Sequence, residues 1–298
     1  MKVLVSGSTG TVGTHLINVI SSDSFEIWRL VRSRAGGENL IFWDPEGSRV
    51  DDPGLLEDFD AVVHLSGENI IGRWTEKKKN SIRRSRVLST RCLANLFSGL
   101  KNPPKTFICA SAIGYYGDRG EERLTERSVA GSGFLPDVCC EWENEANKAS
   151  DLGVRVINLR IGVVLSPEGG ILSSLLFPFK MGLGAVVGSG GQYLSWVSIE
   201  DLSRIIVYLL EHEEISGPVN AVSPNPVTNR QFTATLAAIL QKPAWIAVPE
   251  FAVGLFFGEM GRCTMLAGSM VFPEKLISSG YKFIHEDLGS ALEGIVLR

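Results

Sequence analysis

The sequence predicts an α/β protein with a doubly wound, mostly parallel sheet and a smaller α+β carboxy-terminal domain. One observation is that short apolar runs alternate with amphipathic helical patterns, which is typical of parallel strands joined by helices. The other is that the first strand leads directly into three glycines spaced three apart. Strands are expected at residues 2–6, 26–31, 60–65, 106–110 and 154–160, and helices directly after residue 13 and near residues 76–99 and 137–151.

The glycine segment has the order and spacing of a dinucleotide-binding turn. Gly7 permits a tight turn, Gly10 lets backbone N–H groups approach a pyrophosphate, and Gly13 allows the helix to pack closely on the sheet. The helix amino terminus then presents N–H donors to the anion. An ordinary strand–loop–helix corner is the alternative, but the position at the head of the first unit favours a Rossmann-type nucleotide site. Its expected residues are Gly7, Ser8, Thr9, Gly10, Thr11, Val12 and Gly13.

The second strand indicates which dinucleotide is preferred. It ends in Arg32, Ser33 and Arg34, where an NAD-binding chain usually has an acidic residue for the ribose hydroxyls. Guanidinium groups and a hydroxyl suit a 2′-phosphate. The sequence therefore predicts NADP(H), although two arginines on a solvated loop would look the same.

Length and composition describe a soluble globular chain with room for two domains. The 298 residues are 44% hydrophobic and carry a net charge of −4, which does not favour nucleic acid as a partner. No signal peptide or membrane-spanning run is evident, so a cytoplasmic protein is expected. The five cysteines form no C-x-x-C pair and the four histidines no metal-ligand spacing, so we expect reduced thiols and no metal.

Several further motifs carry a family resemblance. Together with the glycine turn, the chain resembles an atypical, extended short-chain dehydrogenase/reductase, and more narrowly the "epimerase family proteins" of the NAD-dependent epimerase/dehydratase superfamily. These motifs are Asp60, Ser66-Gly67-Glu68-Asn69-Ile70, Arg73-Trp74, Ser85-Arg86, Ser111, Tyr115-Tyr116-Gly117, Trp142-Glu143, Leu159-Arg160-x-Gly162-x-Val164-Leu165, Gly191-Gln192, Ser195-Trp196 and Asn220-x-x-x-Pro224-x-Pro226-x-Thr228-Asn229.

The resemblance implies a domain organisation and more cofactor residues. Residues 1–163, rejoined by about 197–216, would form the NADP-binding domain, and residues 164–196 and 217–298 the substrate domain. A small-molecule substrate is implied, and a homodimer is compatible with the sequence. The additional residues assigned to the cofactor are Leu65, Ser66, Gly67, Glu68, Arg86 and Arg160.

The chain lacks the Tyr-x-x-x-Lys pair with which short-chain dehydrogenases transfer a proton. The residues four positions after its five tyrosines are Arg119, Gly120, Val197, His212 and His285. The remaining catalytic candidates are Ser111, Tyr115 and Tyr116. A shift of one position would replace Ser111 by Ala112, and both tyrosines could equally serve as loop anchors. Glu143 could be a base or a carboxylate that braces its helix.

Three later segments have two interpretations each. Gln192 and Trp196 could offer a substrate a polar group and a flat face, or Trp196 could be core. Apolar residues 251–257 are expected to be core or to line a cleft rather than a partner surface. Residues 77–79 and the arginines after them are expected to form a solvated helix face.

Two functions compete at this point. The first is an NADP-dependent oxidoreductase or epimerase that acts by hydride transfer on an unidentified small, for instance sugar-like, substrate. The second is a non-catalytic NADP-binding sensor or scaffold. The glycine-rich loop and the substrate domain favour the first, and the missing Tyr-x-x-x-Lys pair favours the second.

Overall fold

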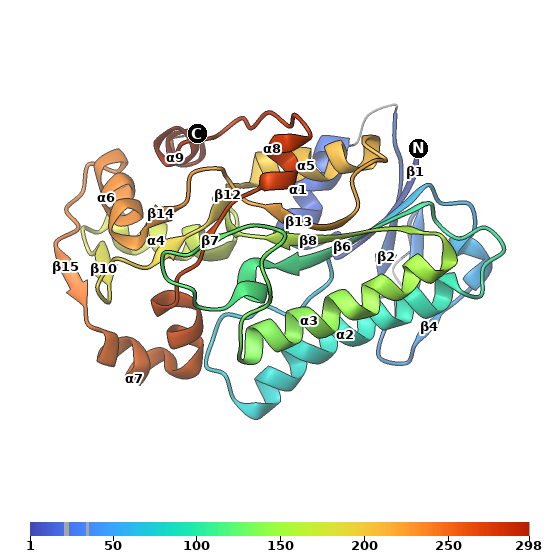
Figure 1. The fold of residues 1–298 in the computed structure, drawn as a ribbon, viewed down its shortest axis with the longest axis horizontal. Coiled ribbons are helices and arrows are strands. Elements are labelled where there is room, and N and C mark those ends of the chain that lie inside the picture. The colour runs from blue at the N-terminus through green and yellow to red at the C-terminus, as the bar shows by residue number, and fades with distance from the viewer. Residues whose placement is uncertain (21–23, 34–35, 298) are drawn as a thin grey trace.

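A computed structural model describes residues 1–20, 24–33 and 36–297. Its centre is an eight-stranded sheet (Figure 1). Every neighbouring pair in this sheet is parallel except β3 with β4. The order across the sheet is β13 (Gly217–Ala221), β8 (Arg155–Ile161), β6 (Thr106–Ala112), β5 (Ala61–His64), β1 (Lys2–Ser6), β2 (Glu26–Val31), β3 (Leu40–Asp44) and β4 (Arg49–Val50). The predicted doubly wound sheet is confirmed.

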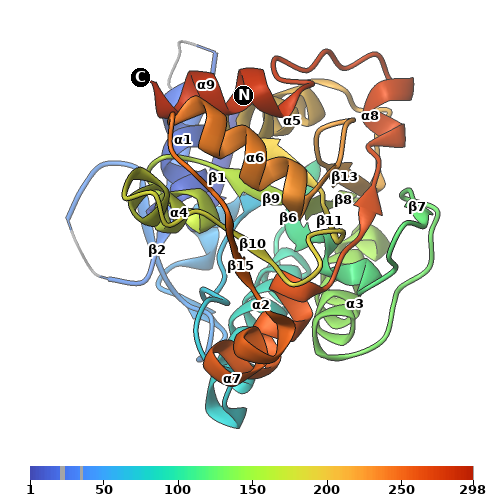
Figure 2. The ribbon, with the colours of Figure 1, turned by 90° about the vertical axis from the view of Figure 1, so that its left-hand side faces the viewer.

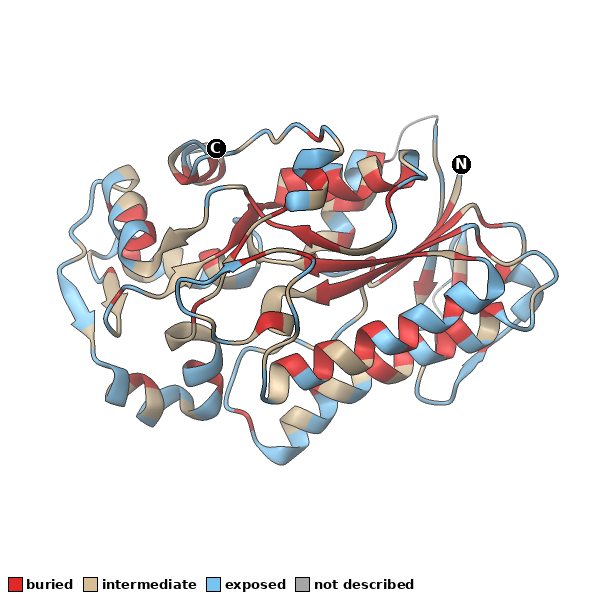
Figure 3. Ribbon diagram, in the orientation of Figure 1, coloured by how far each residue is buried: buried red, intermediate tan, exposed pale blue. Residues whose placement is uncertain are grey.

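Helices cover both faces of the sheet. Because side chains alternate along a strand, Val3 and Val5 of β1 pack toward one face and Leu4 toward the other. The first face is covered by α1 (Thr11–Ile20) and α5 (Ile199–Glu211), and the second by α2 (Glu76–Phe97) and α3 (Phe134–Asn147) (Figure 1). Figure 3 shows the buried strands between these two helical layers.

The smaller domain consists of short strand pairs and helices at one end of the sheet (Figure 2). Its pairs are β9 (Val163–Leu165) with β12 (Trp196–Ser198), β10 (Ala185–Val187) with β15 (Ile246–Val248), and β11 (Tyr193–Leu194) with β14 (Val227–Thr228). Its helices are α4 (Gly170–Lys180), α6 (Asn229–Ile239), α7 (Glu250–Gly261) and α9 (Leu288–Val296). The remaining elements are β7 (Arg123–Leu124) paired with β16 (Met270–Val271), α8 (Glu274–Ser278), the 3-10 helices Pro53–Leu56, Ile113–Tyr116 and Lys148–Leu152, and the π-helix Arg262–Leu266.

One strand from the residues assigned to the substrate domain belongs to the large sheet. β13 (Gly217–Ala221) pairs with β8 and is the edge strand of the large sheet, so that sheet continues to residue 221 rather than ending before 217. Helix α6 follows β14 directly and starts with a reciprocal capping box formed by Thr228 and Gln231.

The structure decides between the two interpretations given for residues 251–257 and for Trp196. Phe251, Leu255 and Phe256 of α7 are strongly exposed, so the prediction of core or cleft lining for residues 251–257 is wrong. Their helix is apolar nearly all round and buries Val253, Met260 and Gly261, and periodicity alone could not show which residues would be buried. Trp196 in contrast is fully buried and its indole N–H donates to Asn225 O, so it is core.

A buried carboxylate ties the carboxy-terminal segment to the large domain. Asp201, in the first turn of α5, accepts hydrogen bonds from the backbone N–H groups of Ile284 (2.8 Å) and His285 (3.0 Å). The hydroxyl groups of Ser198 and Tyr281 also bond to it. Segment 281–285 is therefore held against α5 through one side chain.

A buried histidine lies at the centre of the sheet. His64 of β5 is fully buried, with Nδ1 2.5 Å from Ser6 Oγ and Nε2 3.0 Å from Ser89 Oγ. Burial lowers the pKa of its imidazole to about 3. The ring is therefore neutral in the folded protein over the whole range in which an unfolded histidine becomes charged.

This histidine makes stability sensitive to mild acid. Below about pH 6.5 the unfolded chain binds a proton at His64, whereas the folded chain does not. The contribution of the neutral His64 to the stability of the folded state is therefore complete above pH 6.5 and is lost as the pH falls toward 3. The free energy of unfolding should decrease by about 2 kcal/mol between pH 7 and pH 5, measured by urea unfolding. His64→Gln should flatten the profile by that amount, and an equally steep profile in this variant would contradict the assignment.

Candidate functional site

The carboxyl ends of the parallel strands bring the predicted site residues to one edge of the sheet. The glycine turn follows β1, Arg32 and Ser33 follow β2, and residues 65–68 follow β5. Ser111 and Arg160 lie near the ends of β6 and β8 and are register partners. Arg34 lies outside the described residues. Parallel sheets of this kind bind ligands beyond this edge, at the point where the strand order reverses.

The glycine turn requires glycine at two positions. Gly7 has φ +71°, and a Cβ there would lie 2.7 Å from the backbone of Leu65. A Cβ on Gly13 would lie 2.3 Å from Gly7 O, so α1 can approach the turn only because this residue lacks a side chain. Gly10 N donates to Gly7 O (3.0 Å), which closes the turn. The backbone is therefore shaped to bring the first turn of α1 to the edge of the sheet.

Residues 66–69 are anchored by α2. The Glu68 N–H donates to Ser85 Oγ (2.9 Å), and Arg86 Nη1 donates to Glu68 O (3.0 Å) and Ile82 O (3.1 Å). Lys78 Nζ lies 2.7 Å from Glu68 Oε1 and is the main cause of the lowered pKa of that carboxyl. Glu68 and Arg86, both predicted to contact the cofactor, are thus engaged in holding this loop.

The basic end of β2 remains open to solvent. Arg32 and Ser33 are exposed, directly after the last residue of the strand. The positive charge of Arg32 contributes to lowering the pKa of Glu68, which places these two groups in the same electrostatic neighbourhood. An exposed guanidinium beside the glycine turn is available to a ligand phosphate.

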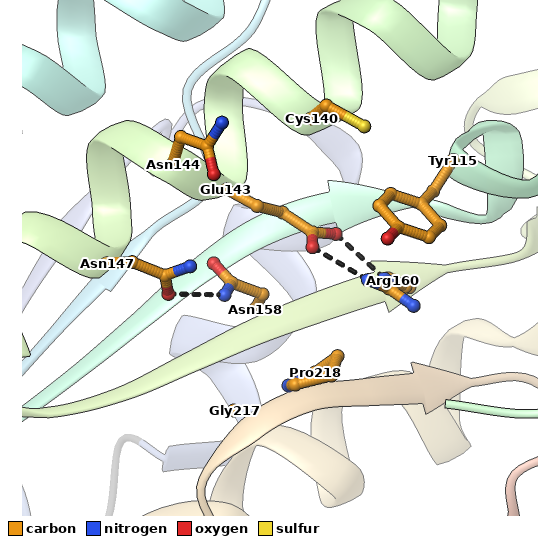
Figure 4. A pocket seen from close by; sticks show the side chains of 9 residues that line it. All are labelled: Tyr115, Cys140, Glu143, Asn144, Asn147, Asn158, Arg160, Gly217 and Pro218. Atoms are coloured by element: carbon orange, nitrogen blue, oxygen red, sulfur yellow. Dashed lines mark hydrogen bonds and ion pairs between the residues drawn. The ribbon is translucent and has the colours of Figure 1, made fainter. Parts of the chain in front are cut away.

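A buried ion pair joins α3 to β8. Arg160 Nε and Nη2 each donate to one oxygen of Glu143, both at 2.8 Å, and both residues are buried (Figure 4). Burial disfavours the charged guanidinium, but the Glu143 carboxylate outweighs that effect and raises the pKa of Arg160. Arg160, predicted to bind the cofactor, thus has two of its donors occupied inside the protein.

Two of the predicted catalytic hydroxyls belong to the same network. Ser111 Oγ donates to Glu143 Oε1 (2.7 Å). The Tyr116 hydroxyl donates to Asn220 Oδ1 (2.7 Å) and accepts from Arg160 Nη1 (3.0 Å). Burial raises the pKa of Tyr116 to about 12, and its side chain has no exposed surface. These hydroxyl groups connect β6, β8 and β13 rather than facing solvent.

Tyr115 differs from its neighbour. It is partly exposed, and its ring lies over the Arg160 guanidinium with 3.4 Å between Cζ and the ring centroid (Figure 4). Of the three predicted catalytic residues it is the one with accessible side-chain surface. Gln192, predicted to face a substrate, instead donates from its amide to Val187 O and Met265 O.

Sequence reasoning identified Glu143 but left its role open, and it missed Asn220 and Cys139 as members of the site. Asn220 was noted only as part of a family motif, since a polar residue in a short strand carries no signal of its partner. Cys139 lies on the sheet-facing side of α3, with its Sγ 3.8 Å from Ala112 O. Burial raises the pKa of this thiol to about 12, so it is not an acid–base group near neutral pH.

Comparison with known proteins agrees with this geometry. The family model described as "NAD dependent epimerase/dehydratase family" matches residues 3–221, which end with β13. The chain belongs to this family. Residues 248–295 of this epimerase/dehydratase-family chain also match a domain of unknown function, DUF1731.

Several relatives match this chain over nearly their full length. "Epimerase family protein Mb2239" of Mycobacterium bovis is 38% identical over 97% of this chain and 96% of its own length. "Epimerase family protein SDR39U1" of Homo sapiens is 34% identical over 99% of this chain and 100% of its own length. The crystal structure of the human protein (isoform 2) with NADPH superposes with a TM-score of 0.92, 33% identity and full coverage of both chains.

A second solved structure is similar over part of its length. The nucleoside-diphosphate sugar epimerase of Corynebacterium glutamicum has a TM-score of 0.82 and 35% identity, and the match covers 99% of this chain and 58% of that one.

Among the described residues, none of the helices has both the length and the apolar character that a membrane-spanning helix needs.

The ion pair should dominate the stability of the site. Glu143→Ala leaves the Arg160 guanidinium buried without its carboxylate, so the free energy of unfolding should fall by about 3–5 kcal/mol. Glu141 lies on the same helix with a half-exposed side chain paired to Arg83, and Glu141→Ala should cost less than about 1 kcal/mol. Chemical denaturation of both variants measures the difference, and equal losses would show that burial of the pair is not the cause.

Proposed function

We propose that this protein is an NADP(H)-dependent oxidoreductase or epimerase that acts on a small, for instance sugar-like, substrate by hydride transfer. The observation that carries the proposal is the glycine turn, where Gly7 and Gly13 leave no room for a Cβ and α1 points its amino terminus at the ligand edge. The human relative crystallised with NADPH has the same fold over its full length, which supports this choice of cofactor.

In this proposal each predicted cofactor residue either contacts the cofactor or supports the residues that do. The backbone of residues 7–13 binds the pyrophosphate, and Arg32 and Ser33 bind the 2′-phosphate. Residues 65–68 form the wall beside the turn. Arg86 and Arg160 support this wall and the neighbouring strand ends, because Arg86 Nη1 is bonded to Glu68 O and Ile82 O, and Arg160 is bonded to Glu143 and Tyr116.

The proposed chemistry assigns different tasks to the three hydroxyls. A bound nicotinamide supplies or accepts the hydride. Tyr115 is the group that we assign to the substrate oxygen, because it keeps accessible surface beside the Arg160 guanidinium. Ser111 and Tyr116 hold the ends of β6 and β8 through Glu143 and Arg160. They act as positioning residues.

A second candidate function is a non-catalytic NADP(H) sensor. The observation in its favour is that α3 contains neither tyrosine nor lysine and presents Cys139, Trp142 and Glu143 as buried residues instead. Such a protein would bind NADPH tightly without turnover. The two experiments below separate the candidates.

The first experiment concerns cofactor choice. NADPH should bind more tightly than NADH, and Arg32→Ala should weaken NADPH binding at least ten-fold, because one charge-assisted contact contributes about 1.5–3 kcal/mol. NADH affinity should hardly change. Arg29→Ala, an exposed arginine in the middle of the same strand, is the matched control. Isothermal calorimetry measures all four affinities, and equal NADPH and NADH affinities in the unaltered protein would refute the assignment.

The second experiment concerns catalysis. Once a substrate screen has yielded NADPH turnover, Tyr115→Phe should lower kcat at least ten-fold with NADPH affinity unchanged, because acid–base catalysis is commonly worth about 10²–10⁴ in rate. Tyr116→Phe is the matched comparison and should mainly lower the melting temperature, since its hydroxyl is buried in the network. Full turnover in Tyr115→Phe would remove Tyr115 from the mechanism. Tight NADPH binding without turnover on any screened substrate would favour the sensor.

A further inference from the structure

The outer end of the small domain carries a strand with an open edge. This strand is β15, which pairs with β10 and lies next to α7 (Figures 1 and 2). The Gly188 N–H donates to Val248 O (2.8 Å), so the backbone groups of Val248 face β10. Successive residues of a strand direct their backbone groups to opposite sides. The N–H and C=O of Ala247 therefore face away from β10.

The other edge of this two-stranded sheet is closed by side chains. The Val187 N–H of β10 donates to Asn229 Oδ1 (2.9 Å), and Val187 O accepts from the Gln192 amide (2.9 Å). Among the residues that the structure describes, none bonds to the outward N–H and C=O of Ala247. Ile246 and Ala247 point their side chains to opposite faces, and both are exposed. Because an uncovered edge is a template for another strand, and two strands alone are only marginally stable, β15 is suited to pair with a further strand.

Large apolar side chains are exposed on both sides of β15 in the chain. Trp245 precedes the strand and is 83% exposed, and Phe251, Leu255 and Phe256 of α7 are 77%, 71% and 73% exposed. Together these four side chains present on the order of 500 Å² of apolar surface. A homodimer interface of ordinary size buries about 800 Å² on each copy, about 65% of it apolar. The exposed surface is therefore as large as one side of a stable dimer requires.

Charges at the two ends of the strand favour a second copy as the partner. Lys242 and Glu250 bracket a segment without charged residues. When two copies of β15 pair antiparallel about Ala247, Lys242 of one copy lies toward Glu250 of the other, and the two-fold axis repeats this contact. The same pairing lets each Ala247 N–H donate to the other Ala247 O. Residues 243–258 include no lysine or arginine, so the surface lacks the positive charge that draws a protein to anionic lipid.

We propose that two copies of this chain form a two-fold symmetric dimer through β15 and α7. The two β15 strands pair antiparallel about Ala247 and join the two small sheets into one sheet of four strands. Trp245, Phe251, Leu255 and Phe256 of each copy pack against the other copy. The dimer does not depend on the proposed reaction.

The first test measures the oligomeric state of the full chain by sedimentation velocity over about 0.5–50 μM. A particle with twice the 32.4 kDa mass of one chain is expected, with a dissociation constant below about 10 μM. Leu255→Asp should raise that constant at least ten-fold, because it places a charge in the apolar interface. Val129→Asp, at an apolar residue that is 69% exposed on another segment, is the matched control and should leave it unchanged.

The open edge is tested separately. Ala247→Pro removes the outward N–H and keeps the bonds between β15 and β10, so it should also raise the dissociation constant at least ten-fold. Ala247→Val retains the N–H and should preserve the dimer.

A charge exchange tests the antiparallel arrangement. Lys242→Glu and Glu250→Lys should each raise the dissociation constant about three- to ten-fold at about 50 mM salt, because each creates two like-charge contacts across the axis. The double variant should recover most of the loss, since it restores opposite charges at both contacts.

Three results would overturn the proposal. They are a chain that stays monomeric at about 50 μM, a dissociation constant unchanged in both Leu255→Asp and Ala247→Pro, and a double charge variant that associates no better than the single ones. A monomer that co-sediments with phosphatidylcholine vesicles would also overturn it and assign the surface to lipid. Thermal melting checks the fold of each variant, and if Ala247→Pro fails to fold, Leu255→Asp and the charge exchange decide.

Discussion

The ion pair between Glu143 and Arg160 is the interaction that holds α3 against the carboxyl ends of the neighbouring strands. Both groups lose their hydration on folding, and their attraction compensates only when the geometry is good and the remaining polar atoms are bonded. The structure meets this condition with Ser111 on one carboxylate oxygen and Tyr116 on a guanidinium nitrogen. Because Tyr116 also bonds to Asn220, one pair fixes the relative positions of α3, β6, β8 and β13. A change in any of these residues would be transmitted to the others.

The same ion pair gives α3 a structural task in this chain. Glu143 uses its helix position to hold β8, and the residues around it are buried and apolar or thiol-bearing. α3 therefore stabilises the large domain through Glu143. The cofactor edge is supported independently by α2, through Ser85 and Arg86 against the backbone of Glu68. The small domain adds a third contact, since a Cβ on Gly169 would lie 2.1 Å from Thr11 Oγ1 beside the glycine turn.

Sequence patterns predicted the elements with local signals and missed those that depend on distant partners. β2 was predicted at its observed bounds, Glu26–Val31, because an apolar run bounded by polar residues identifies a strand locally. The glycine turn was predictable because its spacing reflects backbone geometry. Glu68 and Arg86 were assigned to the cofactor because their charges suit a phosphate. In the structure Glu68 pairs with Lys78, 10 residues away, and Arg86 bonds to Glu68 O, 18 residues away, and to Ile82 O, four residues away. The exposure of Phe251 could not be predicted either, since apolar sequence does not state what will cover it.

The attachment of Asp201 to residues 284 and 285 has a consequence for how the chain is made. A buried carboxylate is stable only when its donors are present, and here two of them are the backbone N–H groups of Ile284 and His285. During synthesis from the amino terminus, α5 emerges more than eighty residues before those donors, as the sequence separations of 83 and 84 require. The Asp201 side chain can therefore be paired with these groups only after residues 284 and 285 have been made, so the first turn of α5 completes its packing later than the strands that precede it in the chain.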